Sequence, residues 1–235
     1  MRNTSVRAVL AVAAIAFLGA AQSSQAAVID FTKASDWAGV AGQWQFTSGT
    51  LFDGVTVQVT SQGPGSLLTF NNGGDVNASC AGVTGLACQG DGLGINDDEV
   101  TKGSSLVDPT LERLYVYFNK PVNVTQIGFL DLFGINTLVG DVAPEMAMWV
   151  AFNGGGFIDG SLVGTDTTTT LGYKTINTSY TGVTALMFYA TTPPASANTD
   201  FAVAKLNITA PEPATLLLTV IGIVATTAFR RRRAA

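Results

Sequence analysis

The sequence Leu111-Glu112-Arg113-Leu114-Tyr115-Val116-Tyr117-Phe118 alternates between two kinds of side chain from one residue to the next. Successive side chains of a β-strand point to opposite faces, so this pattern predicts a strand. Val116 and Phe118 are expected on one face of it, with Tyr115 and Tyr117 on the other. Similar short runs, each indicating a strand, occupy residues 44–47, 55–60, 122–130, 146–152, 185–190 and 201–208.

Turn-forming residues separate these runs, for example Asn119-Lys120-Pro121 and Asn153-Gly154-Gly155-Gly156. Residues 27–210 contain no long amphipathic pattern of helical period, although Asp36-Trp37-Ala38 is expected to begin a short helical turn. In the run 201–208, the inward-facing positions shift after Val203, which predicts a β-bulge. The pattern predicts an all-β fold, specifically a jelly-roll-like antiparallel β-sandwich.

Both ends of the chain have the character of targeting segments. Residues 1–26 combine a basic start, an apolar stretch and small residues at Ser24 and Ala26, which predicts a signal peptide cleaved after Ala26. Residues 214–229 are uncharged, and as a helix they would cover about 24 Å, close to the ~30 Å hydrocarbon core of a bilayer. The basic residues that follow are expected to hold that end in the cytoplasm; they are Arg230, Arg231, Arg232 and Arg233.

A plain membrane anchor has no need of Pro211, Glu212 and Pro213 at its outer edge. Pro-Glu-Pro, an apolar helix and a terminal arginine cluster resemble the PEP-CTERM sorting signal of Gram-negative bacteria. The resemblance implies three segments: the signal peptide (1–26), a β-sandwich ectodomain (27–210) and the sorting signal (211–235). It also implies export, transient anchoring in the inner membrane, processing by exosortase, and delivery to the cell surface or extracellular matrix. The alternative is a permanent single-pass anchor.

The region from about Gly82 to Ala210 is also similar to the β-sandwich ectodomains found among PEP-CTERM proteins. The similarity lies in Gly92-Leu93-Gly94-Ile95 followed by acidic residues, in the run 111–118, in Lys120-Pro121-Val122-Asn123-Val124 and in a last strand before Pro211. It implies a structural or adhesive role in exopolysaccharide or biofilm.

Charge excludes one class of partner. The chain has twelve basic residues, and six of them are arginines of the two terminal segments. Of its seventeen acidic residues, only Glu212 lies in those segments. Residues 27–210 therefore keep six basic and sixteen acidic residues. A formal net charge of −10 on this region repels phosphate backbones, and we expect no nucleic-acid binding.

Cys80 and Cys88 are the only cysteines, and no histidine is present. In an exported protein, two cysteines eight residues apart predict a disulfide. The alternative, a thiolate metal site, lacks further soft ligands.

An acidic loop follows the second cysteine. Oxygen-bearing side chains crowd together at Asp91, Asn96, Asp97, Asp98 and Glu99, and Asp131 stands within an apolar run. Such a loop is either solvated or neutralised by a cation, for which calcium is the suitable ion, with Asp131 as a further candidate ligand. The spacing differs from that of an EF-hand.

The lack of histidine excludes triads and most catalytic metal sites. A carboxylate pair of the glycosidase kind remains as the distant alternative, and its candidates are Asp98, Glu99, Glu112, Asp131 and Glu145. We therefore expect a non-catalytic protein.

The alternative function is the binding of extracellular polysaccharide. The protein would then be a carbohydrate-binding module stabilised by calcium. Tyr115 and Tyr117 are the candidate ligand-binding residues, because aromatic rings pack against sugar rings. The alternative is that these aromatic residues pack within the protein, as is expected of Trp149 between Met148 and Val150.

Overall fold

The computed structural model describes residues 26–51, 54–62, 65–70, 80, 83–96, 99–100, 102–103, 112–135, 144–164, 172–191 and 201–210. Residues 26–210 form a compact unit. The predicted signal peptide up to Gln25 and the predicted sorting signal at 211–235 lie outside the described residues. Within the described segments, every helix is too short or too polar to span a bilayer.

The fold is all-β, as predicted, and almost entirely antiparallel. Among the described residues, the helical part is short and consists of α2 (Ala34–Trp37) followed by the 3-10 helix η1 (Ala38–Val40), which confirms the helical turn predicted there. The strands are β1 (Ala26–Asp30), β2 (Gln45–Thr47), β3 (Val57–Gln62), β4 (Leu68–Phe70), β5 (Leu93–Ile95), β6 (Lys102–Gly103), β7 (Arg113–Leu130), β8 (Met146–Asn153), β9 (Gly156–Val163), β10 (Lys174–Thr191) and β11 (Ala202–Thr209).

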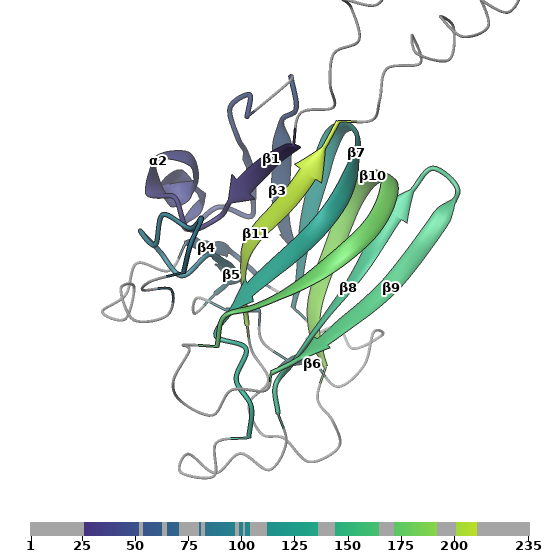
Figure 1. Ribbon diagram of the computed structural model, residues 1–235. Helices are drawn as coiled ribbons and strands as arrows, with labels where there is room; N and C mark the ends of the chain where they lie inside the picture. The colour runs from purple at the N-terminus through teal and green to yellow at the C-terminus, as the bar shows by residue number, and fades with distance from the viewer. Residues whose placement is uncertain are drawn as a thin grey trace, which may run out of the picture. The chain divides into compact units, whose positions relative to one another are not determined.

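All these strands belong to one eleven-stranded sheet, whose main order is β4-β5-β11-β7-β10-β8-β9. β7 and β10 are 18 residues long each and run side by side through its middle, while β9 lies beyond β8 at one edge (Figure 1). β7 exchanges its second neighbour along its length: its first half pairs with β3 and its second half with β11. β1 also pairs with β11, and β6 pairs with β10 in parallel.

The turn predicted at Asn119-Lys120-Pro121 is wrong, because β7 continues through these residues. Proline cannot donate a backbone hydrogen bond and is found in sheets at edges and irregularities. Pro121 sits in the interval between Tyr117 and Val122 where the pairing of β7 with β10 shifts register. The turn at residues 153–156 is confirmed as the β8–β9 connection.

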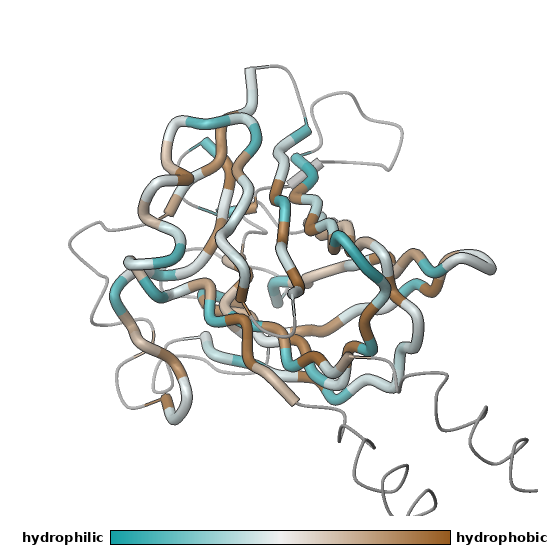
Figure 2. Tube along the Cα trace, turned by 90° about the horizontal axis from the view of Figure 1, so that it is seen from above, coloured by the Kyte–Doolittle hydropathy of each residue, from teal (hydrophilic) through white to brown (hydrophobic). Residues whose placement is uncertain are grey.

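A single large core lies on one face of this sheet. Figure 2 shows hydrophobic and hydrophilic residues alternating along many of the strands. Phe129 is at the centre of the core, with ring centroids 5.7 Å from Trp149, 6.0 Å from Phe188 and 5.3 Å from Phe201. Trp149 is buried as predicted, and its indole Nε1 donates a hydrogen bond to the Tyr180 hydroxyl at 3.1 Å.

The predicted bulge in the last strand is confirmed. The pairing of β11 with β7 shifts register between Val203 and Lys205, so that Val203, Leu206 and Ile208 all reach the core. Side chains of β7 and β10 that point away from the core form the outer surfaces described next.

Candidate functional site

The strands β3, β7, β10, β8 and β9 present three rows of side chains on the side away from the core, which we call the tyrosine face. The register places Gln58, Tyr117, Ala185, Phe152 and Phe157 in one row across these strands. The next row holds Thr60, Tyr115, Met187, Val150 and Asp159. The third has Gln62 and Arg113 at one side and Tyr189, Met148 and Ser161 at the other.

Alternation along β7 builds the centre of this face. Val116 and Phe118 are buried in the core, whereas Tyr115 is half-buried and Tyr117 is 38% exposed on the opposite side, as predicted. The two tyrosine rings are parallel within 5°, with centroids 5.8 Å apart. The Tyr115 hydroxyl donates a hydrogen bond to Oε1 of Gln62 at 2.7 Å, which fixes the orientation of its ring.

Beneath the exposed rings, the apolar side chains of this face bury one another. Val150, Met187 and Tyr189 form a cluster with Tyr115, Met148 and Phe152, all from β7, β8 and β10. In the described part of the chain, no other element contributes to this cluster. The tyrosine face therefore consists of a buried apolar cluster together with the exposed rings of Tyr117 and Phe157.

The hydroxyls of Tyr115 and Tyr189 on the tyrosine face stay protonated at neutral pH. Burial raises the pKa of Tyr115, against a smaller opposing effect of the Arg113 guanidinium. Burial also raises the pKa of Tyr189, and the nearby Asp159 carboxylate adds to that rise. Both phenols are therefore hydrogen-bond donors under physiological conditions.

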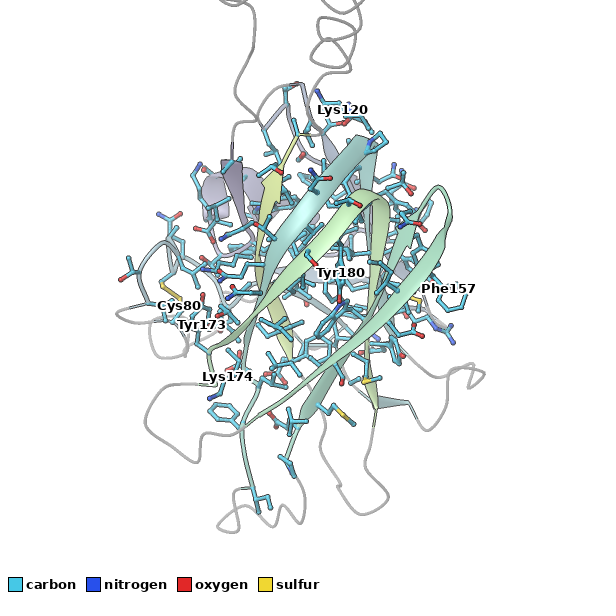
Figure 3. The ribbon with its side chains drawn as sticks, turned by 45° about the vertical axis from the view of Figure 1, so that its right-hand side comes forward. Cys80, Lys120, Phe157, Tyr173, Lys174 and Tyr180 are labelled. Atoms are coloured by element: carbon cyan, nitrogen blue, oxygen red, sulfur yellow. A yellow bond between two sulfur atoms is a disulfide. The ribbon has the colours of Figure 1, made fainter. Side chains whose placement is uncertain are left out.

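A second outer surface, over β7 and β11, is covered. Cys80 and Cys88 form the predicted disulfide, and the segment it closes packs on Leu130, Ala202 and Ala204 together with Tyr173. The segment is further attached to the chain after β1. Oδ2 of Asp30 accepts a hydrogen bond from the amide of Ala87 at 2.7 Å, and the Thr32 hydroxyl accepts one from the amide of Cys88 at 3.0 Å. Figure 3 shows Cys80 and Tyr173 far from Phe157 at the β9 edge.

The candidate calcium ligands do not gather in the described part of the chain, where no group of three acidic or sulfur side chains is placed to hold a metal. Asp97 and Asp98 lie outside the described residues. Asp131 directly follows β7, whereas Asp91 precedes β5. β11 separates these two strands, which corresponds to about 10 Å between them.

Asn96 and Glu99 have local structural roles. Oδ1 of Asn96 accepts a hydrogen bond from the amide of Leu67 at 3.0 Å, and its Nδ2 donates one to Glu112 at 2.6 Å. The carbonyl of Glu99 accepts from the amide of Ile95 at 3.0 Å. The prediction of a loop through residues 91–99 is wrong in its middle, because Leu93–Ile95 is a buried strand between β4 and β11. Calcium binding stays a prediction.

Among the candidate catalytic carboxylates, Glu145 is buried and connects two segments of backbone. Its carboxylate accepts a hydrogen bond from the amide of Phe133, and its own amide donates to the Phe133 carbonyl at 3.1 Å. These contacts secure the chain between β7 and β8. Glu112, bonded to Asn96, similarly supports the turn after β5.

The sequence did not identify Phe157, Phe152 or Gln62 as partners of the two tyrosines. Phe157 is 66% exposed in an edge strand whose residues are mostly exposed on both faces, so no alternating pattern marks that strand. The signal available in the sequence was a phenylalanine that directly follows three glycines. No protein-family model matches the chain, and no curated protein matches it.

Proposed function

We propose that the protein is an exported, non-catalytic component of a bacterial surface or extracellular matrix, with a structural or adhesive role in exopolysaccharide or biofilm. Exosortase would release it from the inner membrane, where its C-terminal helix anchors it first. Its ectodomain would be a jelly-roll-like sandwich. Pro211-Glu212-Pro213 and Arg230–Arg233 support the sorting step. The Cys80–Cys88 disulfide is in keeping with an oxidising destination.

The observation that carries the adhesive role is the tyrosine face. Tyr117 on β7 and Phe157 on β9 present exposed rings three strands apart in one row, on a base of buried apolar side chains. Exposed aromatic residues gathered in this way mark surfaces that bind other molecules. A non-catalytic role is supported by the lack of histidine and by the structural contacts of Glu112 and Glu145.

Adhesion is tested with the full chain expressed in a biofilm-forming Gram-negative host. We expect the double substitution Tyr117→Ala and Phe157→Ala to lower the matrix-retained fraction about tenfold, since each lost ring costs on the order of 1 kcal/mol of binding. Trp44→Ala is the matched control, because Trp44 is exposed to 63% but lies outside the tyrosine face. Quantitative immunoblots of matrix and medium give the ratio. Equal retention of both variants would refute the adhesive role.

The sorting step has its own test. Replacing Arg230–Arg233 with glutamine should block processing and leave export intact, because the charge that stops translocation is lost while the signal peptide is unchanged. Cell fractionation and intact-mass measurement distinguish processed from unprocessed chains. Normal release of a processed protein from this variant would contradict the proposed sorting signal. Replacing Pro211 and Pro213 with alanine then separates the two kinds of anchor, since a plain anchor is indifferent to that change.

A further inference from the structure

The tyrosine face offers aromatic rings and hydrogen-bonding groups in place of open aliphatic surface. Its aliphatic members Val150 and Met187 are only 6% and 8% exposed. The rings of Tyr117 on β7 and Phe157 on β9 remain accessible, and Gln58 of β3 lies beside Tyr117. A molecule that fits this face needs flat apolar patches that alternate with hydroxyl or amide groups.

The charge on the face is balanced. Arg113 contributes one positive charge and Asp159 one negative charge, on opposite sides of the three rows. The domain as a whole is strongly acidic, with a formal net charge of −10 over residues 27–210. A polyanion is therefore repelled by the domain and gains no cationic groove on the face, whereas a neutral ligand meets a neutral surface.

Hydrogen-bonding groups stand on both sides of the rings. On the β3 side, Oε1 of Gln62 accepts from Tyr115, and Nε2 of the same exposed side chain is a hydrogen-bond donor. On the β9 side, Asp159 offers carboxylate oxygens as acceptors and is exposed. The rows run over five adjacent strands, which corresponds to about 19 Å. This length fits a chain of several linked units better than a single small molecule.

We propose that the tyrosine face binds a neutral polysaccharide chain laid across the strands from β3 to β9. This inference rests on the adhesive function proposed above and names the class of ligand. A sugar ring carries CH groups on its faces and hydroxyls around its rim, which is the alternation that the face requires. Its CH face packs on Tyr117 and Phe157, and its hydroxyls bond to Gln62, Asp159 and the Tyr115 hydroxyl. A second protein molecule fits less well, because the aliphatic surface it would cover is already buried.

The test is affinity electrophoresis of the processed protein, purified after expression of the full chain. Native gels contain a neutral β-glucan, a neutral α-glucan, a polyuronate or no polymer. We expect retardation in at least one neutral gel, unchanged between 50 mM and 500 mM salt. Tyr117→Ala should weaken it about tenfold, Tyr117→Phe should keep most of it because the ring remains, and Trp44→Ala should leave it unchanged. Near-ultraviolet circular dichroism verifies that each variant is folded.

Several outcomes would overturn the inference. Retardation by the polyuronate alone, abolished by salt, would show that the ligand is a polyanion. The absence of retardation in every gel, or retardation that survives Tyr117→Ala undiminished, would show that this face binds no neutral polysaccharide. Sedimentation that reveals dimers lost on Tyr117→Ala would assign the face to a second copy of the chain. In each case the matrix-retention experiment still decides independently whether the face is adhesive.

Discussion

Replacing Trp149 with alanine is expected to lower the free energy of unfolding by about 3–5 kcal/mol, the usual cost of removing a large buried aromatic side chain. Trp149 is 1% exposed and lies on β8 between β10 and β9, opposite Phe188 and Gly160. Its indole contacts the Phe129 ring, which itself packs against the rings of Phe188 and Phe201. The cavity would therefore open at the centre of the core.

Urea unfolding of residues 26–210, the compact unit, gives the free energy of unfolding of each variant. Trp149→Phe separates two contributions. It keeps a ring but loses the hydrogen bond to the Tyr180 hydroxyl, so it should cost less than the alanine variant. Trp44→Ala removes the same type of side chain from an exposed site and should change stability by less than about 0.5 kcal/mol. A loss in Trp149→Ala no greater than in Trp44→Ala would contradict the burial of Trp149.

Sequence periodicity predicted those strands in which one face is buried and the other is wet. The first half of β7 and the part of β11 from Lys205 onward are of this kind, and the bulge after Val203 was predictable because the spacing of apolar residues changes there. β9 was missed because an edge strand with most residues exposed has no buried face to impose an alternation. The first half of β10 was missed for a related reason, since Asn177, Ser179 and Thr181 are exposed between half-buried residues.

Strand neighbours could not be predicted, because local pattern does not encode which strands pair. The exchange of β3 for β11 along β7 depends on contacts between residues far apart in sequence. Pro121 lies between the part of β7 that pairs with β3 and the part that pairs with β11, where the pairing with β10 also shifts register, so a residue without an amide hydrogen is tolerated there. Asn119, Lys120 and Pro121 are residues that are common in turns, yet they lie within β7. Their conformation is therefore determined by the pairing of the sheet and not by the local sequence.

The candidate site, like the fold, was predictable only in part from the sequence. Tyr115 and Tyr117 were selected by alternation within one strand, and the structure places both on the outer face. Their companions Gln62, Met187 and Phe157 come from three other strands, so only the register reveals them. The loop at residues 91–99 was interpreted as a candidate calcium site from its acidic composition. Composition could not predict that Asn96 forms hydrogen bonds with Leu67 and Glu112.

Gly160→Ala is expected to cost about 3 kcal/mol, the upper part of the range for overpacking a core. A Cβ at this position would lie 2.3 Å from Cε2 and Cζ2 of Trp149, closer than any real carbon contact. The indole cannot easily give way, because it is held by Phe129 on one side and by the hydrogen bond to Tyr180. Gly160 is thus required by the size of the residue opposite it on the neighbouring strand.

Because one clash carries the cost, the two substitutions should not be additive. In a Trp149→Ala background the ring is absent, and Gly160→Ala should then cost less than about 1 kcal/mol; a double-mutant cycle measured by urea unfolding gives this coupling directly. Gly154→Ala is the matched control, since a Cβ there meets nothing within 4 Å. If Gly160→Ala cost as much without the indole as with it, backbone conformation and not contact with Trp149 would be the reason for glycine. A coupling near 2 kcal/mol would instead show that β9, although it lies at the edge of the sheet, is held in register by the shape of a single core residue.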